Sequence, residues 1–180
     1  MDEYYRAVQQ LPAWLAQPLG RFPSETAAQV QEIRLRAGHG VCFTLQGRQT
    51  PLQALPACPA QLRQICLTQL QLDEIFHTLC GGVVHAHQTE LAQGFLTTAS
   101  GCRVGIAGKY VDREGQIVLQ QVHSINMRIA RAVCTPLPEQ LCSVLQQHFT
   151  GMLLAGEPGS GKTTLLRQMA AYLAAEHSRV

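Results

Sequence analysis

Eight consecutive residues in the C-terminal part of the chain match the spacing G-x-x-x-x-G-K-[ST]. They are Gly156, Glu157, Pro158, Gly159, Ser160, Gly161, Lys162 and Thr163. Glycines without a Cβ atom let successive backbone N–H groups converge on an anion, and a helix that begins directly after them adds partial positive charge. The lysine supplies a full charge, and the hydroxyl that follows can ligate a hard cation. This combination indicates a binding site for a polyphosphate such as a nucleotide.

We therefore expect Lys162 to contact the β- and γ-phosphates of ATP and the Thr163 hydroxyl to ligate Mg²⁺. The predicted ATP-binding residues are Gly156, Glu157, Pro158, Gly159, Ser160, Gly161, Lys162, Thr163 and Thr164. The Glu157 side chain should point outward, because the phosphates would repel a carboxylate. The chain contains 15 glycines but only two lysines, Lys109 and Lys162. A chance match is expected in about one in a thousand chains of this composition.

Hydrolysis needs more than this loop. ATPases of this kind also use an acidic residue at the end of a later strand to hold Mg²⁺, and a group that positions the attacking water. The sequence reaches Val180 without such a strand. We expect the chain to be truncated, because one strand, one loop and one helix cannot bury both faces of the strand. ATP hydrolysis is thus expected of the complete protein, whereas this chain lacks the acidic residue.

The residues around the loop predict the start of an α/β domain at 133–180. The stretch "GMLLAG" at 151–156 predicts a short apolar strand, and Thr164–Ala175 is rich in residues that favour a helix. A strand, a glycine-rich loop and a helix form the opening unit of a P-loop domain.

Residues 1–132 predict a separate α+β domain. Predicted helices cover 2–17, interrupted near Pro12, and the residues between Thr68 and Gly81. Predicted strands are Ile33–Arg36, Val41–Leu45, Gly94–Thr98, Arg103–Tyr110, Ile117–Val122 and Ile125–Ala130, with a turn at Asp112–Gly115. Strands joined by short turns, with few helices, favour an antiparallel sheet.

Composition limits the partners and the compartment. The formal net charge is +2 and only 6% of residues are aromatic, so a dedicated nucleic-acid binder is not expected. Seven cysteines without a C-x-x-C pair favour reduced thiols and a cytoplasmic protein. No apolar run reaches the roughly 18 residues of a membrane span, so any peripheral association with a membrane is expected to occur through partners.

The stretches "EIRLRAG", "GFLTTASGCRVGIAG", "INMRIAR" and "GEPGSGKTTLLR", in this order, resemble the stage III sporulation protein AA family of endospore-forming bacteria. The resemblance runs from about Gln31 to the C-terminus. It implies an ATPase with a RecA-like domain, similar to the hexameric motor ATPases of type II and type IV secretion systems. The family implies a homo-hexameric ring in the mother-cell cytoplasm, acting on the components of a secretion-like channel between mother cell and forespore.

The resemblance also directs attention to Arg103, Arg128 and Arg131. In related secretion ATPases, arginines in or after the N-terminal domain can reach a nucleotide held at a subunit boundary, where a guanidinium fork suits phosphate oxygens. We hypothesise that Arg128 has this role; the alternative is an arginine that pairs with a carboxylate of a neighbouring strand or is simply solvated. The family usually has Gly-Gly-His before its Arg-Val-Gly, whereas this chain has Ser100-Gly101-Cys102 before Arg103.

Two other functions are compatible with the same sequence. The chain could be a non-enzymatic docking module whose P-loop is vestigial, or a fragment of a nucleic-acid translocase. The translocase has the support of the P-loop, but the sequence shows no basic groove with interleaved aromatic residues.

Overall fold

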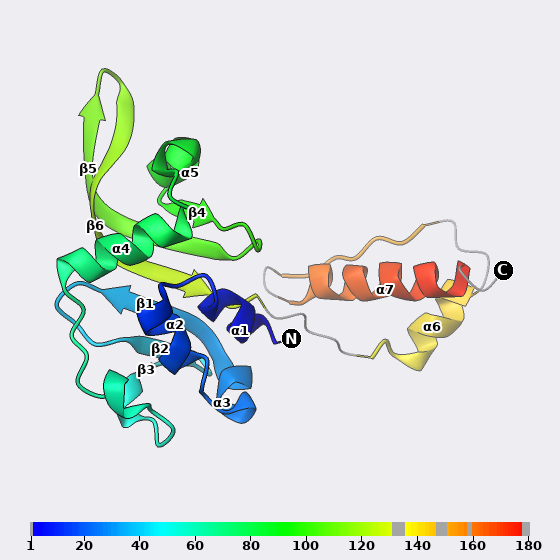
Figure 1. Cartoon of the computed structure of the whole chain (residues 1–180). Coiled ribbons are helices and arrows are strands. Elements are labelled where there is room, and N and C mark those ends of the chain that lie inside the picture. Colours follow the sequence, from blue (N-terminus) through cyan, green and yellow to red (C-terminus); the bar gives the residue numbers. More distant parts are fainter. Residues whose placement is uncertain (1, 131–135, 147–150, 158–159, 178–180) are drawn as a thin grey trace. The chain divides into compact units, whose positions relative to one another are not determined.

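The computed structural model describes residues 2–130, 136–146, 151–157 and 160–177. It divides into two compact units, Met1–Ala130 and Arg131–Val180 (Figure 1). The first unit combines helices with an antiparallel sheet, which confirms the predicted α+β class. Its strands are β1 (Val30–Arg36), β2 (Cys42–Leu45), β3 (Arg48–Pro51), β4 (Phe95–Thr97), β5 (Arg103–Arg113) and β6 (Gln116–Arg128). Its helices are α1 (Glu3–Val8), α2 (Ala13–Leu19), α3 (Ser24–Gln29), α4 (Gln69–Leu79) and α5 (Gln88–Ala92), with short 3-10 turns at Leu52–Ala54, Ala60–Leu62 and Val84–His87.

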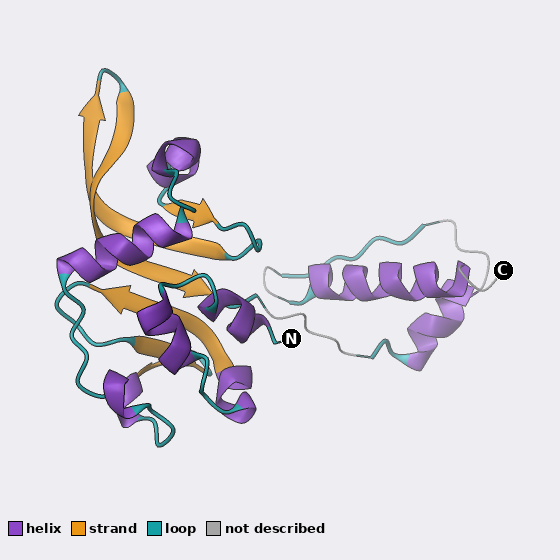
Figure 2. Ribbon diagram, in the orientation of Figure 1, coloured by secondary structure: helices purple, strands orange, loops and turns teal. Residues whose placement is uncertain are grey.

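The six strands are ordered β3-β2-β1-β6-β5-β4, and every neighbouring pair is antiparallel (Figure 2). β1 lies between β2 and β6, so Ile33 is opposite both Phe43 and Met127. All three side chains are fully buried. Because side chains alternate between the two faces of a strand, the neighbouring polar residues of β1 and β6 lie on the opposite face.

The apolar face of the sheet is covered by helices of the same unit, as Figure 1 shows for α1, α2 and α4. The rings of Tyr4 and Phe22 lie edge-on to Phe43 of β2, with centroids 5.8 and 5.4 Å away. The buried Tyr4 hydroxyl donates a hydrogen bond of 2.9 Å to the Leu19 carbonyl oxygen. The aromatic cluster therefore joins the first two helices to the sheet.

Helix α4 begins where the sequence predicts. The Thr68 side chain accepts a hydrogen bond from the Gln71 backbone N–H, and the Gln71 side chain accepts one from the Thr68 backbone N–H. This capping box satisfies two N–H groups that the helix itself leaves unpaired. The Gln69 side chain donates to the Val122 carbonyl oxygen at 2.8 Å, which ties the start of α4 to β6.

Strands β5 and β6 form one long hairpin. Its turn is at Asp112–Gly115, as predicted, and the Asp112 carboxylate accepts a hydrogen bond from the Gly115 N–H. Glu114 and Gly115 have φ angles of 54° and 83°, the left-handed values that tight hairpin turns require. β6 is continuous over Gln116–Arg128, whereas the sequence predicts two strands there. The register shifts between Ala107 and Gly108 and again between Lys109 and Tyr110. At each shift β6 has an extra residue, so its alternation of apolar and polar side chains is interrupted while the strand continues.

Several short elements were not predicted, among them β3, α3 and α5. The short strand β3 pairs with β2 at the edge of the sheet, in a region where the sequence predicts no strand. Pro51 ends this strand, a position where the missing N–H is tolerated because the strand is at the edge. Helix α3 is only six residues long, too short for a periodic pattern to reveal.

The second unit contains α6 (Glu139–Gln146) and α7 (Lys162–His177). Leu145 and Met169 are buried, and the Gln146 side chain donates to the Tyr172 hydroxyl at 2.6 Å, so the two helices pack together. The predicted strand at 151–156 is not formed: residues 151–157 are irregular. A strand needs a neighbour to receive its backbone hydrogen bonds, and none lies beside this segment in the described part of the unit. Among the described residues, no helix is long and apolar enough to cross a membrane.

Gly108 provides a test of the hairpin. A Cβ atom at this position would lie 2.0 Å from the Gln121 carbonyl oxygen, a backbone atom that cannot move aside without distorting β6. We expect Gly108→Ala to lower the free energy of unfolding by about 2 kcal/mol or more. Denaturant unfolding followed by the fluorescence of Trp14, the chain's single tryptophan, measures this change.

Gly105→Ala is the matched control on the same strand, because its Cβ atom would meet nothing closer than 3.9 Å. Its effect should stay below about 1 kcal/mol. Equal effects of the two substitutions would contradict the close approach of Gly108 to Gln121, and with it the register of β5 on β6.

Candidate phosphate-binding loop and arginine cluster

The predicted phosphate-binding loop leads directly into a long helix. Helix α7 begins at Lys162 and runs for 16 residues. Gly161 has a φ of +85°, a left-handed value that residues with a Cβ atom rarely adopt. Its carbonyl oxygen accepts the first helical hydrogen bond, from the Leu165 N–H at 2.9 Å. The backbone therefore turns sharply at the last glycine of the pattern, and the first N–H groups of α7 follow immediately.

The Lys162 side chain folds back over the loop. Its Nζ donates hydrogen bonds to the carbonyl oxygens of Gly156 and Glu157, at 2.7 and 2.6 Å, and contacts the Ser160 hydroxyl at 3.4 Å. An ammonium group has three donors, so these oxygens occupy all of them. The Lys162 ammonium group is therefore held against the described residues of the loop.

Gly156 and Ser160 fit closely together. A Cβ atom on Gly156 would lie 3.0 Å from the Ser160 hydroxyl oxygen, so a larger residue would push this side chain away from Lys162. The Ser160 N–H donates to the Glu157 carbonyl oxygen at 3.2 Å, which closes a turn inside the loop. Pro158 and Gly159 lie outside the described residues.

A hollow of about 530 Å³ lies beside the loop within the second unit. It is lined by Pro136, Pro138, Leu154, Ala155, Ser160, Gly161, Lys162, Thr164, Leu165 and Gln168. One wall is apolar and the other consists of the loop and the first turn of α7, a combination that suits a ligand with a flat apolar part and an anionic part. Thr164 is half-buried in this wall, whereas Thr163 is exposed.

The described residues around the loop form no ready-made metal centre. Within the described ranges, no three His, Cys, Asp or Glu side chains lie close enough together to hold a metal ion. A cation at Thr163 would need further oxygen ligands from a bound phosphate or from water.

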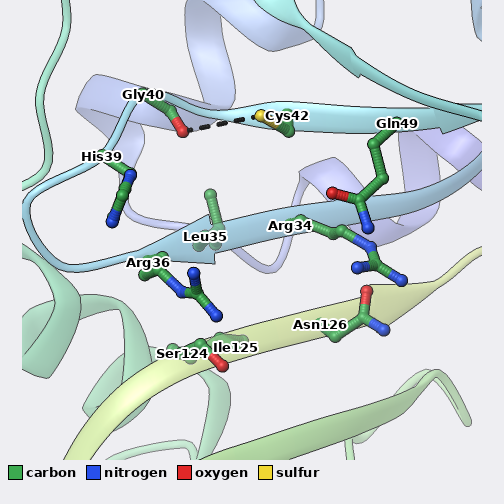
Figure 3. Close-up of a pocket in the computed structure, with 10 residues that line it drawn as sticks. All are labelled: Arg34, Leu35, Arg36, His39, Gly40, Cys42, Gln49, Ser124, Ile125 and Asn126. Atoms are coloured by element: carbon green, nitrogen blue, oxygen red, sulfur yellow. Dashed lines mark hydrogen bonds between the residues drawn. The ribbon is translucent and has the colours of Figure 1, made fainter.

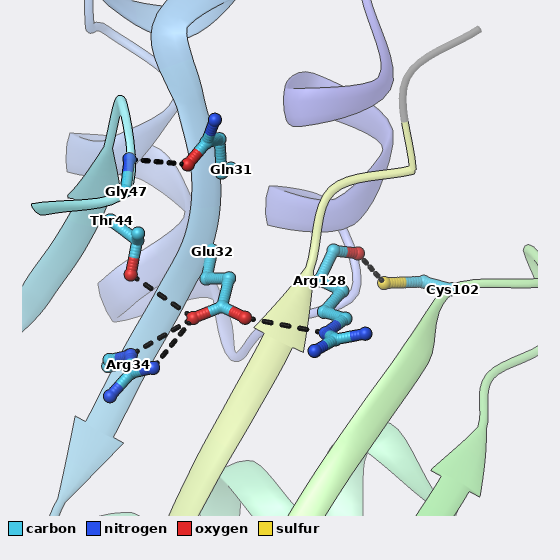
Figure 4. A network of polar contacts seen from close by, with 7 residues as sticks. All are labelled: Gln31, Glu32, Arg34, Thr44, Gly47, Cys102 and Arg128. Carbon is cyan, nitrogen blue, oxygen red and sulfur yellow. Dashed lines mark hydrogen bonds and ion pairs between the residues drawn. The ribbon is translucent and has the colours of Figure 1, made fainter. Parts of the chain in front are cut away.

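Two of the three predicted arginines, Arg103 and Arg128, belong to the first unit. Arg128, at the end of β6, has a side chain that is 73% exposed, and its Nε donates to Glu32 Oε1 on the neighbouring strand β1 at 3.3 Å (Figure 4). Arg103, at the start of β5, places its guanidinium group 4.2 Å from the centre of the Phe95 ring, within the range of a cation–π contact. Arg131 lies outside the described residues.

Glu32 is the residue of this cluster that the sequence analysis missed. Its side chain is only 14% exposed, and its Oε2 accepts hydrogen bonds from the Arg34 Nη2 and Nε atoms at 2.9 and 3.1 Å and from the Thr44 hydroxyl at 3.1 Å. The signal in the sequence is the spacing "EIR", which places a carboxylate and a guanidinium group on the same face of a strand.

The environment of Glu32 holds its carboxylate in the ionised form. Burial alone raises the pKa of this group, but hydrogen bonds from Arg34, Thr44 and Asn126, together with the charge of Arg34, outweigh burial and keep the pKa below its usual value. The carboxylate therefore stays available to orient Arg34 and Arg128 at neutral pH.

Arg128 and Arg103 also line a hollow of about 550 Å³ on the polar face of the sheet. Beside it, the buried Cys102 thiol donates to the Arg128 carbonyl oxygen at 3.1 Å. A buried thiol directly before β5 is thus connected to the end of β6.

Comparison with solved structures gives low identities. The pilus retraction motor PilT with bound ADP is 16% identical, with a TM-score of 0.49, over 80% of this chain and 39% of that chain. The Legionella pneumophila ATPase DotB is 15% identical, with a TM-score of 0.42, over 81% of this chain and 38% of that chain. The VirB11 ATPase of the Brucella suis type IV secretion system, in complex with sulphate, is 14% identical, with a TM-score of 0.40, over 94% of this chain and 46% of that chain.

Comparison at the sequence level gives the family. Stage III sporulation protein AA of Bacillus subtilis (strain 168) is 29% identical over 161 residues, which are 89% of this chain and 49% of that protein. The chain thus spans about half the length of this relative. The family model described as "Sporulation stage III, protein AA" matches residues 7–179. The chain therefore belongs to the stage III sporulation protein AA family.

Proposed function

We propose that this chain is the nucleotide-binding N-terminal portion of a sporulation motor ATPase, and that it binds ATP with Mg²⁺ at Gly156–Thr164. The observation that carries the proposal is the position of Lys162 Nζ inside a loop that ends at a left-handed glycine and continues into a 16-residue helix. Bound ATP would supply a reactive γ-phosphate, and the residues of this chain bind and orient it.

Each residue of the loop has a distinct role in this proposal. Lys162 leaves the carbonyl oxygens of Gly156 and Glu157 and donates to the β- and γ-phosphates instead. The first N–H groups of α7, aided by the helix dipole, donate to the same anion. The exposed Thr163 hydroxyl ligates Mg²⁺, while Thr164 lines the adjoining hollow. Glu157 is exposed and binds only through its backbone.

Arg128 is the proposed second contact to the nucleotide. Glu32 holds its Nε, so the Nη side of the guanidinium group is left for the phosphate oxygens of a nucleotide at a subunit boundary. Hydrolysis is proposed for the whole protein, because this chain spans about half of its curated relative.

The wider role follows from the family. The proposed assembly is a homo-hexameric ring in the mother-cell cytoplasm that acts on membrane channel components between mother cell and forespore, with hydrolysis driving subunit movement. The alternative is a docking module without catalysis. It is supported by the apolar residues that the second unit exposes, Leu153 at 91% and Leu166 at 48%, which a partner could cover.

Lys162→Ala tests the nucleotide site. ATP with Mg²⁺ should slow amide exchange in residues 160–177 of the unaltered chain, because a ligand at about 100 times its Kd stabilises the state that binds it by about 2.7 kcal/mol. Removing the Lys162 ammonium group should abolish this protection. Hydrogen–deuterium exchange measured with and without ATP gives the result.

Lys109→Ala is the matched control. Lys109 is the chain's other lysine and is exposed on β5, so its loss should leave ATP protection unchanged. If the unaltered chain gained no protection at any ATP concentration below about 10 mM, the docking module would be the better interpretation, since typical metabolic nucleotide affinities are far tighter.

Arg128→Ala tests the second contact. In the full-length protein, we expect the ATPase rate to fall at least about tenfold while nucleotide affinity changes less, because an arginine that reaches the phosphates from another subunit stabilises the transition state. Steady-state hydrolysis and nucleotide titration separate the two effects. The control is Arg21→Ala, an exposed arginine of the same unit outside the Glu32 cluster. An unchanged rate with Arg128→Ala would exclude this role.

A further inference from the structure

A second polar hollow lies on the sheet of the first unit and shares Arg34 with the hollow beside Arg128. It has a volume of about 550 Å³, within the range of small-ligand pockets. The residues that line it are Arg34, Leu35, Arg36, His39, Gly40, Cys42, Gln49, Ser124, Ile125 and Asn126 (Figure 3). They come from β1, β2, β3 and β6 and from the loop after β1, so four strands hold the hollow in place.

Strand alternation places its polar groups on one face. Arg34 and Arg36 are two residues apart on β1, roughly 7 Å along the strand, and they pair with Asn126 and Ser124 of β6. Figure 3 shows the Gln49 side chain extending towards the Arg34 guanidinium group, and the Arg36 side chain further along β1 near Ser124. Two guanidinium forks, two amides, a hydroxyl and an imidazole thus surround the hollow.

The charges in this hollow are not balanced. Its lining contains two arginines and no Asp or Glu. Arg34 is partly neutralised by Glu32, which lines the other hollow. Arg36 makes no hydrogen bond or ion pair with its side chain among the described residues, and its side chain is exposed. A guanidinium group without a partner, in a concave donor-rich setting, is free to form a bidentate contact with an oxyanion.

One buried atom also lacks a partner. Asn126 Oδ1 is shielded from solvent and accepts no hydrogen bond in the described structure. An unsatisfied buried acceptor destabilises the fold, and such groups call for an explanation other than packing. As an acceptor, this atom makes no hydrogen bond to an ionised phosphate, so the donors for an anion are those of Arg34, Arg36, Gln49 and Ser124.

We propose that this hollow, formed around Arg34, Arg36, His39 and Gln49, binds the phosphate group of a small molecule, independently of the loop at Gly156–Thr164. The planar forks of Arg34 and Arg36 contact the phosphate oxygens, and Gln49 and Ser124 donate further hydrogen bonds. A compact anion suits two guanidinium forks that lie two residues apart on one strand. The site is part of the first unit alone and needs no residue of the nucleotide-binding loop.

The test uses the full chain carrying Lys162→Ala, so that the loop does not bind the probe. Inorganic pyrophosphate is titrated at constant ionic strength, and backbone amide shifts are followed by NMR. We expect saturable shifts at Arg36, His39 and Ser124. Adding Arg36→Gln should weaken this binding at least about tenfold, since it removes a charge-assisted bidentate contact. Gln49→Glu, which adds a negative charge without changing shape, should weaken it as well.

Arg21→Gln is the control, because it makes the same change of charge at an exposed position outside the hollow. Equal weakening by Arg21→Gln and Arg36→Gln would show only a general charge effect and overturn the proposal. Absence of saturable shifts would overturn it too. A twelve-nucleotide oligothymidylate is titrated as well. If it binds and Arg36→Gln weakens its binding, while pyrophosphate does not bind, the ligand is single-stranded nucleic acid and the proposal of a small phosphate is overturned. None of these outcomes bears on nucleotide binding at Gly156–Thr164, because every protein in this experiment carries Lys162→Ala.

Discussion

The pairing of β1 with both β2 and β6 is the constraint on which the first unit depends. β1 is a central strand, and its register with β6 runs from Glu32 opposite Arg128 to Arg36 opposite Ser124. A shift by one residue would turn Ile33 and Leu35 out of the core and bring Arg34 into it. The hydrophobic core and the arginine-bearing face are therefore fixed together: the aromatic packing that holds Phe43 also determines where the guanidinium groups lie.

Glu32 divides the polar face into two parts with different electrostatics. Without its carboxylate, Arg34 and Arg128 would be two like charges on neighbouring strands. With it, both are oriented by hydrogen bonds, and the pKa of Glu32 stays low enough for the negative charge to persist. Arg36 lies two residues beyond Arg34 on β1, and it makes no ion pair with the Glu32 carboxylate. The face thus has a partly neutralised end near Arg128 and an uncompensated end near Arg36.

Local signals in the sequence predicted the elements that local interactions determine. The start of α4 at Thr68 and the turn at Asp112–Gly115 depend on residues a few positions apart, and both are formed as expected. Strand β3 could not be predicted in this way, because its existence depends on β2 offering an edge. The same holds for Glu32 as the partner of Arg128, since these residues are 96 positions apart and meet only through the order of strands.

In the second unit too, the parts that depend on nearby residues are formed and the part that depends on neighbouring strands is not. The turn at Gly161 and the start of α7 need only glycine's conformational freedom and helix-forming residues, and they are present. The apolar segment before the loop needs neighbouring strands, and it remains irregular with Leu153 exposed. The Lys162 ammonium group is stabilised by hydrogen bonds to carbonyl oxygens of the loop, and a bound anion would take the place of these oxygens. A loop of this kind can therefore hold its charged side chain in place before the sheet that supports it is complete, because its hydrogen bonds all come from within seven residues of sequence, Gly156 to Lys162.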